Sequence, residues 1–196
     1  SAKLTAEFFT GKQVDLREIQ EYKNKGGYVN DWNLTEAVIT SRGFKVSKSK
    51  IIKKFQEYYQ KFMKNEKWLL NKKLLGELSK NYELAILTGR PKEEAIYALK
   101  NFSVANYFSE VIAMEDVTKQ KPNPEGLLKI LRKFNADNAF YFGDTIDDVK
   151  AAVNANIISI GILPPSDKSE ELKSLLLKNG AKMVIEDINQ IWSVLK

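Results

Sequence analysis

The sequence predicts an α/β fold in which a doubly wound parallel sheet is combined with a small all-helical domain. From residue 82 onward, short apolar runs alternate with helical patterns, which is typical of strands and helices that alternate along a parallel sheet. The first 80 residues show helical periodicity only. A chain of 196 residues can form one well-packed domain with a small appendage. We therefore expect a helical domain and linker over residues 1–80 and an α/β core over residues 81–196.

Caps, glycines and apolar runs define the expected elements. Asp15 and Ser47 are placed to cap two of the N-terminal helices, and the pair Gly26 and Gly27 ends the second helix. The expected helices span 2–9, 16–25, 32–41, 48–63, 92–102, 125–134, 147–154, 169–179 and 188–195, and the expected strands span 83–87, 111–114, 139–142, 157–162 and 183–186. Ligands of such sheets bind beyond the carboxyl ends of the strands, so polar residues at those ends are the functional candidates.

The absence of two residue types narrows the chemistry. The chain contains no cysteine and no histidine. This excludes disulfides, thiolate nucleophiles, a Ser-His-Asp triad and the usual zinc sites. Catalysis would therefore use carboxylates, lysine, hydroxyl groups or a bound metal.

The net charge of +6 comes mostly from lysines scattered along the helices. A nucleic-acid-binding module would show clustered arginine with interleaved aromatic residues. We therefore expect no nucleic-acid partner and favour a solvated surface rich in Lys and Glu, as in heat-adapted proteins. No apolar stretch approaches the length of a membrane span, and the first residues do not resemble a signal peptide. We expect a soluble, cytoplasmic monomer or homodimer without a membrane partner.

The densest group of acids lies in residues 138–152, NAFYFGDTIDDVKAA. Asp144 follows an apolar strand, and Asp147 and Asp148 open the next helix. Three carboxylates within five residues repel one another unless a cation lies between them, and hard oxygen ligands suit Mg²⁺. Alternatively, Asp147 and Asp148 are ordinary first-turn acids that the helix dipole stabilises. Asp144 precedes the helix, so the dipole does not account for it.

Two other strand ends carry groups that suit a phosphate. Thr88, Gly89 and Arg90 follow one strand at the start of a helix, where a hydroxyl, a glycine amide and a helix N-terminus form an anion site. Alternatively, Thr88 only caps the helix. Lys121 lies in a loop that two prolines stiffen. An ammonium group fixed there would neutralise a phosphate and the nearby carboxylates together, although most lysines of this chain are expected to be solvated.

The order of Thr88, Lys121 and an aspartate cluster resembles the haloacid dehalogenase superfamily of phosphatases, in its subfamily with a helical cap, such as the phosphoglycolate phosphatase-like enzymes. The matching stretches are LTGR at 87–90, KQKPNPEGL at 119–127 and GDTIDDVKAA at 143–152. The resemblance implies that Thr88 and Lys121 bind the transferring phosphoryl group, and that Lys121 also bridges to the nucleophile. It further implies that Asp144 is a direct Mg²⁺ ligand and that Asp148 supports the water shell of the metal. Receiver domains of response regulators use the same residue types in the reverse order.

The first motif of that superfamily, Asp-x-Asp at the end of its first strand, does not occur in the sequence. In the family, its first Asp attacks phosphorus and its second protonates the leaving group. The resemblance places this strand between those that end at Thr88 and Asp144, so its absence would leave two strand edges unpaired. We expect that the segment carrying the motif lies upstream of Ser1. The alternatives are true loss in a pseudoenzyme and a strand donated by a second chain.

We therefore predict a Mg²⁺-dependent phosphatase that hydrolyses a small phosphorylated metabolite through an aspartyl phosphate. The helical cap would choose the substrate, and its polar turn with Gly27, Tyr28 and Asn30 is best placed to reach a ligand. Alternatively, this turn is an ordinary connection between two helices. Two other functions remain open: a catalytically inactive binding or scaffold protein, and haloacid dehalogenation, which needs no metal.

Overall fold

The structure is a computed structural model, and it describes residues 1–28 and 30–195. The chain divides into two compact units, Ser1–Lys67 and Trp68–Lys196. The first unit is helical and the second is α/β with parallel strands, so the predicted fold class is confirmed. Along the described residues, no helix combines the length and the apolar character that crossing a bilayer requires.

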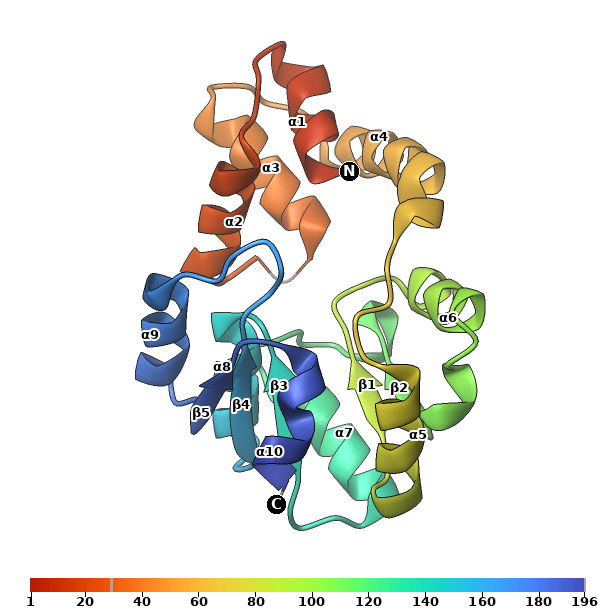
Figure 1. Ribbon diagram of the computed structural model, residues 1–196. Helices are drawn as coiled ribbons and strands as arrows, with labels where there is room; N and C mark the ends of the chain where they lie inside the picture. Colours follow the sequence, from red (N-terminus) through yellow and green to blue (C-terminus); the bar gives the residue numbers. More distant parts are fainter. Residues whose placement is uncertain (29, 196) are drawn as a thin grey trace. The chain divides into compact units, whose positions relative to one another are not determined.

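Two helices of the first unit begin at residues whose side chains accept hydrogen bonds from the helix N-terminus. Ser47, the second expected cap, lies at the start of its helix but forms no side-chain capping bond. Asp15 accepts from the amide of Arg17 at 2.9 Å, and Asn30 accepts from the amide of Asn33 at 2.9 Å. The helices of this unit, from red to light orange in Figure 1, are α1 (Ala2–Thr10), α2 (Leu16–Lys25), α3 (Asp31–Ser41) and α4 (Lys48–Phe62), followed by the 3₁₀ turn η1 (Met63–Asn65).

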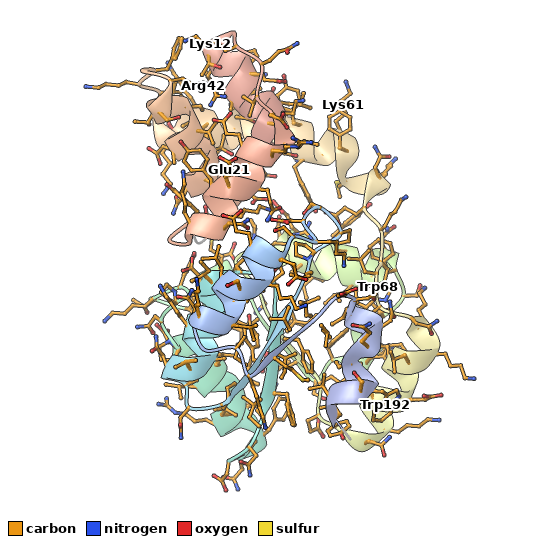
Figure 2. All side chains as sticks on the ribbon, turned by 60° about the vertical axis from the view of Figure 1, so that its left-hand side comes forward. Lys12, Glu21, Arg42, Lys61, Trp68 and Trp192 are labelled. Atoms are coloured by element: carbon orange, nitrogen blue, oxygen red, sulfur yellow. The ribbon has the colours of Figure 1, made fainter. Side chains whose placement is uncertain are left out.

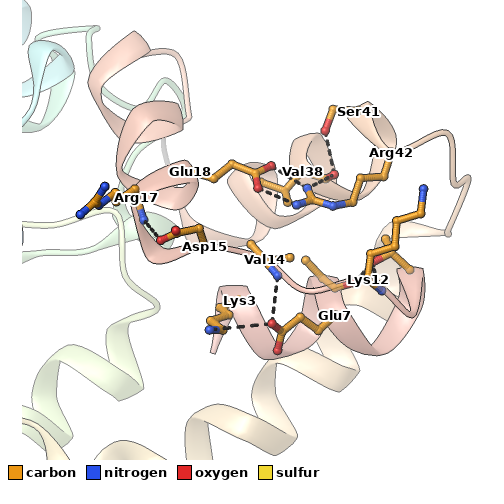
Figure 3. Close-up of polar contacts among 12 residues, drawn as sticks. Lys3, Glu7, Lys12, Val14, Asp15, Arg17, Glu18, Val38, Ser41 and Arg42 are labelled. Atoms are coloured by element: carbon orange, nitrogen blue, oxygen red, sulfur yellow. Dashed lines mark hydrogen bonds and ion pairs between the residues drawn. The ribbon is translucent and has the colours of Figure 1, made fainter.

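The helical unit has a core of its own. A cluster of buried apolar side chains comes from α1, α3, α4 and the loop before α2: Ala6, Val14, Leu34, Val38, Ile39 and Ile51. Polar contacts hold that loop and the ends of α2 and α3 (Figure 3). The carboxylate of Glu7 accepts from the Val14 amide at 3.0 Å, and Arg42 forms a two-point ion pair with Glu18 at 2.5 and 2.6 Å. Such paired contacts fix geometry as well as charge.

The second unit alternates helices with short parallel strands. Its elements in chain order are α5 (Lys72–Asn81), β1 (Ala85–Leu87), α6 (Lys92–Asn101), η2 (Ala105–Tyr107), β2 (Glu110–Ile112), η3 (Met114–Asp116), α7 (Glu125–Phe134), β3 (Phe140–Gly143), α8 (Ile146–Asn154), β4 (Ile158–Ile162), α9 (Glu170–Lys178), β5 (Met183–Ile185), η4 (Ile188–Gln190) and α10 (Ile191–Leu195). Most predicted elements appear within two residues of their expected bounds. The last predicted helix is divided into the 3₁₀ turn η4 and the short helix α10.

The strands form two parallel groups. β1 pairs with β2, with Ala85 opposite Glu110, and β3, β4 and β5 pair in that order, with Phe140 opposite Ile158. Among the described residues, β1 and β3 each have one hydrogen-bonded neighbour, so each has an open edge. In Figure 1, β3 and β1 are the neighbouring members of the two groups. This is the arrangement that we expected for a sheet that lacks a central strand.

The burial of the strands agrees with these open edges. Three successive residues of β4 are buried, whereas β1 and β3 contain no fully buried residue and Phe140 is 40% exposed. Apolar runs of this kind are ordinarily buried on both faces in a parallel sheet. The residues of β1 still alternate between two helical layers, because Ile86 packs with the α5 and α6 cluster and Leu87 with the α7 and α8 cluster.

The C-terminal segment connects the two strand groups. After β5, Asn189 accepts from the Asn71 amide at 2.6 Å and donates to the Leu69 carbonyl at 3.1 Å. Trp192, labelled with Trp68 in Figure 2, donates from its indole Nε1 to Glu77 of α5 at 3.4 Å. Through these contacts, the segment that follows β5 holds the helix that precedes β1.

Candidate functional site

The candidate residues of the α/β unit lie in the loops that follow the strands. Thr88 directly follows β1, Asp144 directly follows β3, and Lys121 lies in the loop between η3 and α7. These loops are at the carboxyl ends of parallel strands, which is where ligands bind in such sheets. The structure brings two of the predicted residues, Lys121 and Asp148, into direct contact.

The centre of the site is a buried ion pair. The ammonium of Lys121 lies 2.5 Å from Oδ1 of Asp148, and the two side chains are only 16% and 6% exposed. Tyr141 of β3 completes the group, because its hydroxyl donates to the same Oδ1 at 2.9 Å and accepts from Lys121 at 3.3 Å. Two of the three N–H donors of Lys121 are therefore in use, and the third has no partner among the described residues.

The carboxylate of Asp148 is fully occupied by donors of the chain. Its Oδ1 accepts from Lys121 and Tyr141, and its Oδ2 accepts from the Thr145 amide at 3.1 Å and the Thr145 hydroxyl at 2.7 Å. A carboxylate has about four acceptor positions. These four donors satisfy all of them, so this arrangement leaves no lone pair of Asp148 for a further ligand.

The electrostatics of the group follow from its burial. Burial alone would raise the pKa of Asp148, but the Lys121 charge and the hydrogen bonds from Lys121, Thr145 and Tyr141 hold it below its ordinary value. Burial would lower the pKa of Lys121, but Asp148 and Tyr141 raise it above its ordinary value. Burial also raises the pKa of the Tyr141 hydroxyl, and the charge of Asp148 adds to this effect. At neutral pH the site therefore contains an ammonium, a carboxylate and a neutral phenol.

The local sequence explains why Asp148 lies in this position. Thr145 is the N-cap of α8, and Thr145 and Asp148 form a reciprocal capping box, with the Asp148 amide donating to the Thr145 hydroxyl at 3.1 Å. Asp148 is thereby folded back over the end of β3. A Cβ atom on Gly143 would lie only 2.3 Å from Cβ and 2.6 Å from Cγ of Asp148. Glycine at position 143 is therefore required by the approach of the aspartate.

Contacts with the loop after β2 hold the loop that carries Thr88. The Thr88 hydroxyl oxygen accepts from the Arg90 amide at 3.1 Å, while the first amide of α6, that of Lys92, donates to Glu115 at 2.9 Å. Helix α6 is thus capped by Glu115, and the alternative that Thr88 caps it does not describe this structure. The hydroxyl proton of Thr88 has no acceptor among the described residues. Thr88, Gly89 and Arg90 are all half-buried.

The other two aspartates of the cluster differ in exposure. Asp144 is exposed at the end of β3, whereas Asp147 is only 8% exposed in the first turn of α8. Within residues 1–28 and 30–195, no group of three or more acidic side chains is arranged to enclose a metal ion. Asp144 thus places an exposed carboxylate at the end of a strand.

The predicted substrate turn of the helical unit connects α2 with α3. Gly27 adopts a positive φ of 83°, which only glycine adopts readily. Tyr28 packs its ring at an edge against Tyr22, 5.4 Å between centroids, and the side chain of Asn30 caps α3. Tyr28 and Asn30 therefore have structural contacts within this unit, which agrees with the alternative that the turn is a connection between helices.

Sequence reasoning missed several residues of the site. The sequence places Tyr141 correctly in an apolar strand but does not indicate the role of its hydroxyl, although the hydroxyl of a buried tyrosine normally finds a partner. The pattern Thr145-x-x-Asp148 is a capping-box signature and would have indicated the fold-back of Asp148. No local signal marked Glu115, because its contact lies 23 residues away in the sequence.

Comparison with known proteins identifies the family. Residues 2–162 match the family model described as haloacid dehalogenase-like hydrolase. The chain belongs to this family. The family predicted from the three motifs is thereby confirmed, and the α/β unit with its helical companion is the fold of a haloacid dehalogenase-like hydrolase.

Two relatives match this haloacid dehalogenase-like chain in sequence over part of their length, and a solved structure matches it in fold. Imidazoleglycerol-phosphate dehydratase of Phytophthora nicotianae is 28% identical over 182 residues, which are 86% of this chain and 40% of that protein. Phosphoglycolate phosphatase of Escherichia coli is 32% identical over 91 residues, which are 45% of this chain and 36% of that protein. The crystal structure of a predicted phosphoglycolate phosphatase from Haemophilus somnus has a TM-score of 0.78 at 17% identity, covering 100% of this chain and 90% of that one. The chain thus spans less than half the length of the first two relatives.

The close approach of Asp148 to Gly143 makes a pair of glycine substitutions informative. Gly143→Ala should lower the free energy of unfolding by about 1–3 kcal/mol, because the new methyl group would overlap Asp148. The matched control is Gly76→Ala in α5, where the nearest atom would be an ordinary 3.7 Å away. This control should gain about 0.5–1 kcal/mol from helix propensity. Urea denaturation of both variants checks the prediction, and equal effects would contradict it.

The buried ion pair predicts a pH-dependent stability. Asp148→Asn leaves the Lys121 ammonium buried without its carboxylate, and should lower the free energy of unfolding by about 3–5 kcal/mol at pH 7. Because the folded-state pKa of Asp148 is lowered, its contribution is present above its unfolded pKa of about 4 and is lost as the pH falls through the folded pKa. The difference between wild type and variant should therefore shrink below about pH 4. A difference that stays constant in urea titrations from pH 7 to pH 2 would contradict this assignment.

Proposed function

We propose that the protein containing this chain is a Mg²⁺-dependent phosphatase that hydrolyses a small phosphorylated metabolite through an aspartyl phosphate. The nucleophilic aspartate would lie on a strand upstream of Ser1. The observation that carries this proposal is the buried Lys121–Asp148 pair, which holds an ammonium group at the strand ends of a unit whose β1 and β3 edges are open. An added strand between β1 and β3 would bring its carboxyl end to the same loops.

The reaction would use an upstream aspartate and the residues described above. A carboxylate oxygen of that aspartate attacks phosphorus, the bond between phosphorus and the metabolite oxygen breaks, and the second upstream aspartate gives that oxygen a proton. Water then cleaves the aspartyl phosphate and releases inorganic phosphate. Lys121, through its remaining N–H donor, and Thr88, through its hydroxyl proton, would bind the phosphoryl oxygens. Gly89 and Arg90 would add an amide and a guanidinium to the same anion site.

Asp144 is the residue that we assign to direct contact with Mg²⁺. Mg²⁺ keeps several waters and is usually held by one or two carboxylates together with phosphate oxygens. The exposed Asp144 fits this requirement, whereas the oxygens of Asp148 are occupied by Lys121, Tyr141 and Thr145. We assign Asp144 as the direct ligand and Asp148 as the group that positions Lys121. When bound, the metal would supply positive charge against the phosphoryl oxygens.

The helical unit would act as the cap that chooses the substrate. Its turn with Gly27, Tyr28 and Asn30 is the candidate contact, because it is a polar turn with two successive glycines of positive φ. Both Tyr28 and Asn30 also have structural contacts within the unit. Phosphoglycolate phosphatase, one of the relatives, is named for a small phosphorylated acid. This name supports a small phosphorylated metabolite as the substrate class.

A catalytically inactive binding protein is the second candidate. It is favoured by one observation, the absence of Asp-x-Asp from the 196 residues. Haloacid dehalogenation is a weaker third candidate, because a reaction that needs no metal gives no role to an exposed Asp144. Dependence of turnover on Mg²⁺ separates it from phosphatase activity.

Extension of the chain tests the phosphatase proposal. A form extended upstream to include the natural preceding codons should hydrolyse p-nitrophenyl phosphate with Mg²⁺, whereas residues 1–196 alone should not. Removal of an activated nucleophile typically costs about 10⁴-fold or more in rate. If the extended form shows no turnover above this chain, the binding-protein candidate is supported instead.

Substitution of Asp144 tests the metal assignment. In the extended form, Asp144→Asn should raise the Mg²⁺ concentration for half-maximal activity by at least about tenfold, since a ligand charge is lost. The matched control is Asp137→Asn, which removes an exposed aspartate in the loop before β3. The two variants should differ strongly in titrations with MgCl₂, and equal Mg²⁺ requirements would refute the role of Asp144.

A further inference from the structure

The loop that carries Lys121 is closed by the first residue of the following helix. The carboxylate of Glu125 accepts hydrogen bonds from two successive backbone amides, those of Thr118 at 3.0 Å and Lys119 at 2.8 Å. These amides lie three and two residues before Lys121. A carboxylate that accepts two backbone N–H groups forms strong, charge-assisted bonds and fixes the direction of the chain. Glu125 itself lies outside the buried group of Lys121, Tyr141 and Asp148.

Further contacts fix the rest of the same loop. The side-chain oxygen of Asn123 accepts from the Glu125 backbone amide at 3.0 Å, and the backbone amide of Asn123 donates to the Gln120 carbonyl at 3.0 Å. The side chain of Asn154, at the end of α8, donates to the Pro122 carbonyl at 3.0 Å. Lys129 connects Glu125 at 2.8 Å with the Asp116 carbonyl at 2.7 Å. The backbone is thus held on both sides of Lys121.

A fixed backbone matters here because the lysine side chain is long and flexible. Ordering such a side chain costs about 1.5–2 kcal/mol of rotamer entropy, and a mobile loop would add backbone entropy to that cost. A loop already closed by Glu125 does not have to be ordered when the ion pair with Asp148 forms. The same argument applies to binding geometry, in which a shift of about 1 Å weakens the contact with a reacting group.

We propose that Glu125 is a positioning residue, which holds the loop 118–124 so that the Lys121 ammonium reaches Asp148 and presents its remaining N–H donor to the phosphoryl group. The effect on turnover rests on the proposed phosphatase function. The effect on the position of Lys121 does not rest on it and is measurable in the chain as it stands.

The first experiment measures Lys121 directly in residues 1–196. Glu125→Gln keeps the size of the side chain but offers one acceptor oxygen for two amides. Hydrogen exchange of the Thr118 and Lys119 amides should accelerate at least about tenfold, as for local opening of a loop. Acetylation of Lys121 by acetic anhydride, followed by mass spectrometry, should accelerate at least about threefold. Unchanged acetylation of Lys121 in a folded Glu125→Gln variant overturns the proposal.

The matched control is Glu170→Gln. Glu170 is the first residue of α9 as Glu125 is of α7, and it forms an ion pair with Lys173 one helical turn later, as Glu125 does with Lys129. It accepts no backbone amide from a preceding loop within the described residues. Glu170→Gln should therefore leave the exchange of residues 118–119 and the acetylation of Lys121 unchanged. A second variant, Asn154→Ala, removes an independent contact of the same loop and should accelerate Lys121 acetylation even if Glu125→Gln fails to fold.

The second experiment measures catalysis in the extended form. Glu125→Gln should lower kcat at least about tenfold and leave KM within about twofold, because Lys121 would act on the phosphoryl group during its transfer. Glu170→Gln should change neither value. An active extended form in which Glu125→Gln leaves kcat unchanged overturns the catalytic part of the proposal. If the extended form is inactive, the phosphatase function fails, and acetylation of Lys121 still decides the role of Glu125.

Discussion

The ion pair between Lys121 and Asp148 is the interaction on which the architecture of the strand ends depends. It joins a loop residue to the first turn of α8 across 27 residues of sequence. Either charge alone would destabilise the fold in so buried a position, and the opposite charge offsets this cost. The residues around this pair are suited to it. Gly143 leaves space for the Asp148 side chain, and Thr145 holds that side chain over the end of β3. The Tyr141 hydroxyl donates to the same Asp148 oxygen that Lys121 contacts.

Much of the fold could be predicted from sequence because its signals are local. Apolar runs, glycines and caps such as Asp15 depend on residues within a few positions of one another, so the strands and helices appear close to their expected bounds. The order of Thr88, Lys121 and Asp144 along the chain is also visible in the sequence, because one helix and one strand separate each residue from the next. The resemblance to the family rests on this order, and the match over residues 2–162 confirms it.

The parts that could not be predicted depend on contacts between distant segments. The Glu115 contact with the first amide of α6 spans 23 residues, and no periodicity marks it. The saturation of Asp148 by four donors likewise requires three segments to meet, and no local pattern indicates it. The division of the strands into β1–β2 and β3–β4–β5 was anticipated only through the family resemblance. The local pattern of each strand gives no information on how many neighbours it has.

The separate core of the helical unit has a consequence for the effect of mutations. Its buried side chains, from Ala6 to Ile51, pack against one another within residues 1–67. Mutations in this unit therefore alter its own stability and surface while the Lys121–Asp148 pair keeps its surroundings in the other unit. The helical unit can thus be varied or exchanged while Tyr141 and Thr145, the described hydrogen-bond partners of the Lys121–Asp148 pair, stay in the chain.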